Sequence, residues 1–220
     1  MKIQWGFRDV LLALIGLVPV VWYLIEWNAL PDPMATHFTL TGDVDGSMSK
    51  GSFFALMTVL TLGMPVFMKI PRRIDPRAQN YESFAGVLEL FRMAVTLLLA
   101  AVTIVTILFN LGYPMNMKMV AMLGLGALFI LLGNYMGQVR PNYFIGIKTP
   151  WTLTNEDVWK RTHRASGPLI VVTGLISLVC AFLPTGLGVW IFGAALVVTM
   201  LIFPFAYSYM LWKKLMTEGK

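Results

Sequence analysis

The sequence predicts an all-α membrane protein with six transmembrane helices. Only 13% of its 220 residues are charged and its mean hydropathy is +0.72, whereas soluble domains carry about 25% charged residues. The 48 residues from 165 to 212 contain no Asp, Glu, Lys or Arg. As one helix this run would measure roughly 70 Å, while a bilayer core is about 30 Å thick. Because Pro184-Thr185-Gly186 interrupts the run, we expect two spans joined by a tight hairpin.

Four further charge-free windows each approach the ~20 residues that a membrane-spanning helix needs. They cover residues 10–25, 51–68, 93–117 and 119–139. Basic residues precede the first window, as in a signal peptide, but no small-residue cleavage pattern follows it. We therefore expect an uncleaved first span.

The distribution of the 17 Lys and Arg residues predicts that both termini are cytoplasmic. With this orientation only Lys50 and Lys118 face outward, and the other 15 lie in cytoplasmic segments, as the positive-inside rule requires. We therefore interpret the net charge of +6 as a mark of orientation in the membrane. It gives no reason to expect direct binding of nucleic acid.

These spans divide into two predicted domains. Residues 1–72 form an N-terminal two-span unit whose outward loop covers residues 28–50. Residues 73–220 form a four-span unit whose long cytoplasmic loop, residues 137–166, joins spans 4 and 5. Polar, aromatic and proline-rich loops on a rigid scaffold are where recognition tends to occur, so both loops are candidate sites.

In the outward loop, His37 and Lys50 are the candidate binding residues. Asp43 and Asp45 resemble part of a calcium loop, but a third ligand and a distal Glu are absent, which favours a solvated turn. His37 is expected to be a hydrogen-bonding loop residue, with a pH-sensitive or metal-binding role as the alternative. We expect no metal site and no cofactor.

The cytoplasmic loop 137–166 is predicted to turn at Arg140-Pro141-Asn142 and to contain a short amphipathic helix with Thr154 as its N-cap. Trp151 and Trp159 are expected at the membrane interface, next to basic residues that face lipid phosphates. The alternative is a docking platform for a cytoplasmic partner or the mouth of a cavity between helices. We expect Asn134, Asn142, Trp151 and His163 to form one cluster, because buried amides need partners. The full set of candidate ligand- or partner-binding residues is Asn134, Arg140, Asn142, Lys148, Trp151, Trp159 and His163.

Patterns that indicate catalysis are missing from the sequence. It contains neither Gly-x-Ser-x-Gly nor His-Glu-x-x-His. His37 and His163 are predicted on opposite sides of the membrane, so they cannot share a metal ion. We therefore expect a protein that is not an enzyme.

The loop motifs resemble the SdpI family of bacterial membrane proteins. The resemblance lies in Gly133-Asn134-Tyr135-Met136, in the stretch from Arg140 to Leu153, and in Val158-Trp159, Thr162-His163 and Gly167. The outward stretch Leu30-Pro31, His37-Phe38, Gly42 and Ser49-Lys50 is similar to the domain of unknown function that often accompanies it. Lys148 stands where many relatives are expected to have Arg, which keeps the charge but loses the bidentate fork.

The resemblance implies a multi-pass protein of the bacterial cytoplasmic membrane. The founding member of the family protects its producer from a membrane-active peptide toxin and sequesters a cytoplasmic repressor. The expected partners are therefore membrane lipids, a peptide toxin and a cytoplasmic repressor protein. The alternative is a small transporter or a lipid- or small-molecule-binding membrane protein. Nothing in the sequence indicates an oligomeric state.

The topology can be tested by labelling single cysteines from outside intact cells. In a Cys180→Ser background, a cysteine at Ser47 should react with a membrane-impermeant maleimide, and a cysteine at Gln79 should react only after the cells are opened. The reason is the skewed partition of Lys and Arg. Labelling of the Gln79 reporter in intact cells would show that the orientation is wrong.

Overall fold

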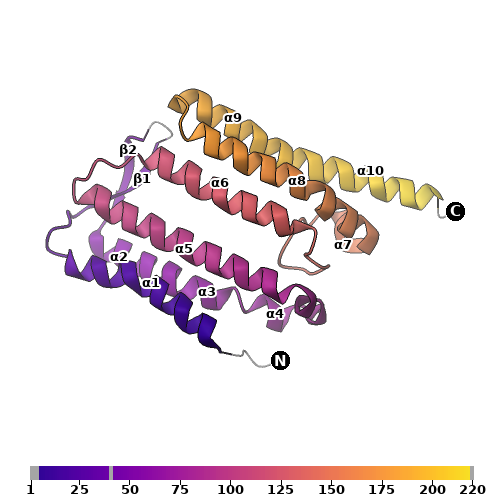
Figure 1. The fold of residues 1–220 in the computed structure, drawn as a ribbon, viewed down its shortest axis with the longest axis horizontal. Coiled ribbons are helices and arrows are strands. Elements are labelled where there is room, and N and C mark those ends of the chain that lie inside the picture. The colour runs from indigo at the N-terminus through magenta and orange to yellow at the C-terminus, as the bar shows by residue number, and fades with distance from the viewer. Residues whose placement is uncertain (1–4, 40–41, 219–220) are drawn as a thin grey trace. The chain divides into compact units, whose positions relative to one another are not determined.

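The computed structural model describes residues 5–39 and 42–218 of the chain, most of which are helical (Figure 1). Six helices are long and apolar enough to cross a membrane, which confirms the fold class predicted from the sequence. They cover Phe7–Ile25, Lys50–Phe67, Ala78–Asn110, Met117–Met136, Glu156–Cys180 and Gly186–Glu218. The chain is therefore a multi-pass membrane protein.

Several spans are built from more than one helical element. The elements are α1 (Phe7–Ile25), β1 (Met34–Phe38), β2 (Val44–Met48), α2 (Lys50–Thr58), η1 (Val59–Gly63), α3 (Met64–Phe67), α4 (Pro71–Ile74), η2 (Ala78–Phe84), α5 (Ala85–Asn110), α6 (Met117–Met136), α7 (Pro150–Thr154), α8 (Glu156–Cys180), α9 (Thr185–Val197), η3 (Val198–Ile202) and α10 (Phe203–Glu218). The π-helical segments η1 and η3 are each followed two residues later by a proline, Pro65 and Pro204. Proline has no N–H for the carbonyl four residues back, and the wider π spacing accommodates this loss.

The chain forms two compact units. The first contains residues 1–70 and 92–124, and the second contains residues 71–91 and 125–220. Residues 92–124, which the sequence analysis assigned to the second domain, thus pack with the N-terminal part. The reason is visible in Asn110, whose side-chain amide donates to Ala35 O (2.9 Å) and accepts from Ala35 N (2.8 Å).

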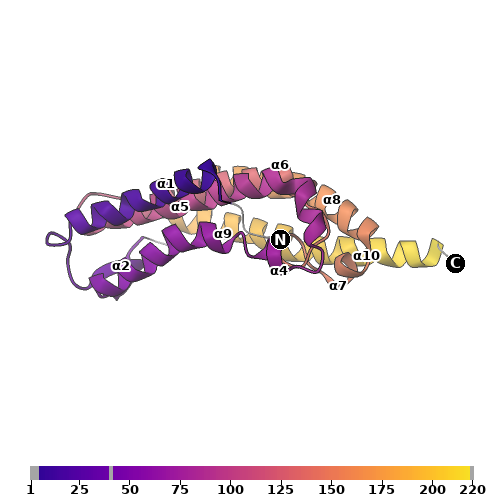
Figure 2. The same ribbon diagram turned by 90° about the horizontal axis from the view of Figure 1, so that it is seen from below.

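In the first unit, α1 and α2 pack against each other (Figure 2). The loop between them contains an antiparallel hairpin, β1–β2, which the sequence analysis did not predict. An apolar core lies beneath this hairpin and is formed by Tyr23, Leu30, Met34, Phe53 and Ile107. The hairpin was missed because its strands are only five residues long and mix polar with apolar residues.

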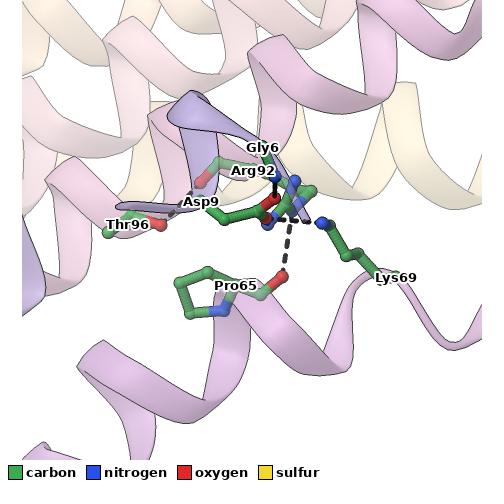
Figure 3. A network of polar contacts seen from close by, with 6 residues as sticks. All are labelled: Gly6, Asp9, Pro65, Lys69, Arg92 and Thr96. Carbon is green, nitrogen blue, oxygen red and sulfur yellow. Dashed lines mark hydrogen bonds and ion pairs between the residues drawn. The ribbon is translucent and has the colours of Figure 1, made fainter. Parts of the chain in front are cut away.

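A buried ionic cluster joins the helix ends of the first unit (Figure 3). Asp9, in the first turn of α1, pairs with Lys69 and with Arg92, whose Nη2 lies 2.8 Å from Asp9 Oδ1. Arg92 Nε also donates to Pro65 O at 2.9 Å. The carboxylate therefore lies at the positive end of one helix dipole, and the guanidinium binds a carbonyl near the C-terminal end of the span Lys50–Phe67.

In the second unit, α8 packs closely on the second half of α6. A Cβ on Gly133 would lie 2.6 Å from Gly167 O, and a Cβ on Gly167 would lie 2.8 Å from Gly133 O. One heptad away, Gly126 and Gly174 make the same reciprocal approach. Small residues let helix backbones come together in a membrane. These two glycine pairs therefore allow α6 and α8 to pack closely, and the close packing fixes the positions of the two helices that the loop joins.

On its other side α8 packs against α9, η3 and α10. Here Thr173 Oγ1 donates to Thr199 Oγ1 at 3.1 Å, in the middle of two apolar helices. The expected hairpin at Pro184-Thr185-Gly186 is present. Helix α8 ends at Cys180, α9 begins at Thr185 with Pro184 as its N-cap, and the two helices pack against each other.

The loop between α6 and α8 differs from the prediction. We expected a separate amphipathic helix with Thr154 as its N-cap, but Thr154 is the last residue of α7. The N-cap of the following helix is Asn155, whose Oδ1 accepts from Asp157 N and Val158 N. That helix, α8, continues without interruption to Cys180. Both residue types are good caps, so sequence alone did not place the helix start.

Candidate functional site

The loop between α6 and α8 is organised around the side chain of Asn142, which is fully buried. Its Oδ1 accepts from Phe144 N (2.9 Å) and Ile145 N (2.7 Å). Its Nδ2 donates to Arg140 O (2.8 Å) and Ile145 O (2.9 Å). One amide side chain thus satisfies four backbone groups of the turn, as asparagine does in loops that lack regular secondary structure. We call residues 140–147, with the side chains that bind them, the loop site.

A carboxylate from a distant segment holds the same turn. Asp75 Oδ2 accepts from the Tyr81 hydroxyl at 2.7 Å and from Tyr143 N at 2.8 Å, and Asp75 Oδ1 accepts from Arg77 N at 2.7 Å. The Tyr81 oxygen is also 3.2 Å from Asn142 Oδ1. Both Asp75 and Tyr81 are buried, so their polar groups depend on these partners.

Two further hydrogen bonds tie this segment to the loop. Asn80 Nδ2 donates to Pro141 O at 2.7 Å, and Arg77 Nη2 donates to Leu153 O at 3.4 Å. The 3₁₀ helix η2 and the residues just before it therefore form one wall of the loop site. Sequence reasoning did not identify this wall, although Asp75 is the lone acidic residue between Lys69 and Arg77.

The opposite wall is the first part of α8. His163 is fully buried and its ring stacks on Trp159, with ring centroids 4.1 Å apart. His163 Nε2 accepts from Ile147 N at 2.9 Å, so the proton is on Nδ1, which donates to Trp159 O at 2.8 Å. The imidazole is therefore neutral, and it binds the backbone of the loop at one end and that of its own helix at the other.

A glycine allows the loop to approach this histidine. Gly146 has φ +110°, and a Cβ there would lie 2.5 Å from His163 Nε2. The left-handed conformation and the absent side chain are both required. Next to it, Trp159 Nε1 donates to Val139 O at 2.9 Å. Trp159 is fully buried, so it is not the membrane-interface residue that the sequence analysis expected.

The end of the loop is attached to α10 by hydroxyl groups. The Thr149 side chain caps α7, accepting from Thr152 N, and it also donates to Ser208 Oγ at 3.0 Å. Thr152 Oγ1 donates to Ile147 O at 2.8 Å. Trp151 packs against two aromatic rings of α10, Phe205 and Tyr209. The loop is thus held by three different helices of the second unit.

The structure brings together only some of the predicted site residues. Asn142, Trp159 and His163 line the loop site, and Trp151 lies beside it against α10. Asn134 is apart from them: it is exposed, its Nδ2 donates to Ile130 O within its own helix, and it lines a shallow groove with apolar residues of α6 and Leu178 of α8.

The predicted cations are placed in different ways. Arg140 and Lys148 are exposed. Lys148 Nζ donates to two carbonyls of the turn, Tyr143 O and Phe144 O. The outward-loop candidates belong to the other unit: exposed His37 contacts Asp45, and Lys50 Nζ donates to Trp27 O.

The polar groups of the loop site are engaged with one another rather than poised for reaction. The carboxylate of Asp75 accepts three hydrogen bonds, both nitrogens of His163 are occupied, and the amide of Asn142 binds four backbone groups. Within residues 5–39 and 42–218, no group of three His, Cys, Asp or Glu side chains could hold a metal ion. The arrangement can present a rigid loop surface to which a partner can bind.

Comparison with known proteins places this site in a family. Residues 138–208, which contain most of the loop site and α8–η3, match the SdpI/YfhL protein family. This region belongs to the SdpI/YfhL family. Residues 14–62 match a domain of unknown function, DUF1648. Both matches confirm the resemblance seen in the sequence motifs.

A curated relative has a known role. The chain is 37% identical over 119 residues to the protein named Immunity protein SdpI of Bacillus subtilis (strain 168). The aligned residues are 54% of this chain and 57% of that relative, so the match spans little more than half of its length. No solved structure matches the chain.

Replacing Gly146 tests whether the loop depends on its approach to His163. We expect Gly146→Ala to lower stability by about 1–3 kcal/mol, the usual cost of a strained backbone, because the methyl group meets the imidazole. Gly137→Ala is the matched control, since its Cβ would have ordinary contacts at 3.8 Å. Thermal unfolding of the two purified variants in the same detergent is the measurement. Equal melting temperatures would contradict this account of the loop site.

Proposed function

We propose that this chain is a non-enzymatic immunity protein that protects a bacterial cell from a membrane-active peptide toxin. The observation that carries the proposal is the 37% identity to Immunity protein SdpI, together with a family match that covers most of the loop site. The chain is a membrane protein related to an immunity protein. The proposal adds to this relationship that the chain itself protects a cell against a toxin.

The chemistry of the loop site agrees with a recognition role. Its buried acid, imidazole and amide are all bound to the backbone, which leaves none of them positioned as a nucleophile or general base. Preorganised loops on a rigid scaffold lose little entropy when they bind a partner. The loop site is therefore the proposed surface for a cytoplasmic partner, a repressor protein in the founding member of the family, and the membrane-spanning helices are the proposed surface for the toxin.

Survival under peptide challenge tests this function. A sensitive bacterial host that expresses the chain should survive membrane-active peptides better than the same host with an empty vector. Asn142→Ala should abolish this protection, because it removes four hydrogen bonds from the turn. Asn116→Ala is the matched control: this exposed asparagine accepts from Met119 N at the start of α6, far along the chain from the loop site.

Membrane abundance must be measured by immunoblot alongside survival. If Asn142→Ala protects as well as the unaltered chain at equal abundance, the loop site is only a connector. If the unaltered chain gives no protection against any peptide tested, the immunity role is wrong. Ion-dependent uptake of a solute into liposomes would then favour the alternative, a small transporter.

A further inference from the structure

The turn at the centre of the loop site presents two aromatic side chains to its surroundings. Tyr143 is 44% exposed and Phe144 is 42% exposed. Outside the six candidate spans, these two are the one pair of consecutive residues among the exposed large hydrophobic residues of the described chain. An exposed apolar patch that the fold does not cover indicates an interaction surface.

The backbone that carries these rings is fixed. Tyr143 N donates to Asp75, and Phe144 N and Ile145 N both donate to Asn142. The N–H groups of residues 143–145, which form the tip of the turn, thus all have partners inside the protein. The two rings are therefore exposed on a turn whose backbone is fixed by hydrogen bonds.

Two cations flank the same tip. The guanidinium of Arg77 lies over the Tyr143 ring, 5.2 Å from its centre. Lys148 Nζ lies 3.2 Å from Phe144 O and 3.4 Å from Tyr143 O. The carboxylate beside them, Asp75, is buried and turned toward backbone N–H groups. The tip therefore combines aromatic surface with positive charge.

We propose that the Tyr143–Phe144 tip lies in the headgroup layer of the membrane and that Arg77 and Lys148 bind the phosphate of an anionic phospholipid. Aromatic rings favour the membrane interface, and each basic residue near an anionic surface contributes to binding. Tyr143 is seven residues beyond the end of α6 at Met136, so it lies within about 25 Å of that helix end. The membrane is always present, so it covers the rings continuously, which an occasional soluble partner does not.

This interfacial role replaces the one predicted for Trp159. The sequence favoured tryptophan as the residue at the membrane surface, but Trp159 is buried against His163 and Val139. The residues that the fold leaves exposed are Tyr143 and Phe144. The proposal does not rest on the immunity role. It assigns the tip of the loop site to the membrane and leaves the rest of the loop site as the proposed surface for a cytoplasmic partner.

Spin labelling of the full chain tests the proposal. In the Cys180→Ser background, Phe144→Cys and, separately, Tyr143→Cys would be labelled with a nitroxide and reconstituted into nanodiscs. One set of nanodiscs contains phosphatidylcholine alone and the other also contains phosphatidylglycerol. Thr154→Cys is the matched control, since Thr154 is an exposed polar residue of the same loop.

We expect the labels at 143 and 144 to collide more with oxygen than with a water-soluble nickel chelate, and the label at 154 to show the reverse. Adding phosphatidylglycerol should shift the tip labels further toward oxygen, and Lys148→Gln should reduce that shift. Tip labels that behave like the control would overturn the proposal and leave the tip as a surface for a soluble protein. Labels shielded from both reagents would also overturn it, because protein would then cover the tip. Oxygen contact that does not respond to phosphatidylglycerol or to Lys148→Gln would overturn the phosphate contact.

Discussion

The hydrocarbon core of a bilayer offers no hydrogen-bond partner, so each polar group near it must find one inside the protein. The strongest case is the cluster of Asp9, Lys69 and Arg92, in which one carboxylate binds two cations and Arg92 is almost completely buried. A buried charge without its counter-charge is strongly destabilising. The same constraint explains the paired amide and backbone of Asn110 and Ala35, and the paired hydroxyls of Thr173 and Thr199.

The loop site follows from the same constraint at the ends of the spans. A loop without helix or strand leaves its backbone groups unpaired unless side chains bind them. Asn142 does this from within the turn, and Asp75 and His163 do it from two other segments of the second unit. The result is a loop whose shape is set by its own buried polar residues. The proposed recognition role depends on that rigidity, since a preorganised surface loses less entropy on binding.

Much of the fold could be predicted from the sequence because hydrophobic length is a direct consequence of bilayer thickness. The number of spans followed from the charge-free windows, together with the Pro184-Thr185-Gly186 interruption that divides the longest window into two spans. The hairpin β1–β2 did not, because its short strands have no clear alternation. In the loop site, Asn142 and His163 were identified from their polar character. Asp75, which accepts from Tyr143 N in the same turn, is 67 residues before Asn142 in the sequence, and no local pattern connects it to the loop. Trp159 was misplaced because a tryptophan near a span end is equally compatible with the interface and with a buried indole whose N–H has found a carbonyl.

The central claim, that buried polar groups compensate one another, is tested most directly by a double-mutant cycle on the ionic cluster. Thermal unfolding in detergent would be measured for Asp9→Asn, Arg92→Met and the double variant. Asp9→Asn should be strongly destabilising, since it removes the carboxylate that pairs with both Lys69 and Arg92, and the loss should approach about 3–5 kcal/mol. Adding Arg92→Met should recover part of this loss, giving a coupling energy of about 1–3 kcal/mol. Strictly additive effects of the two substitutions would contradict the account.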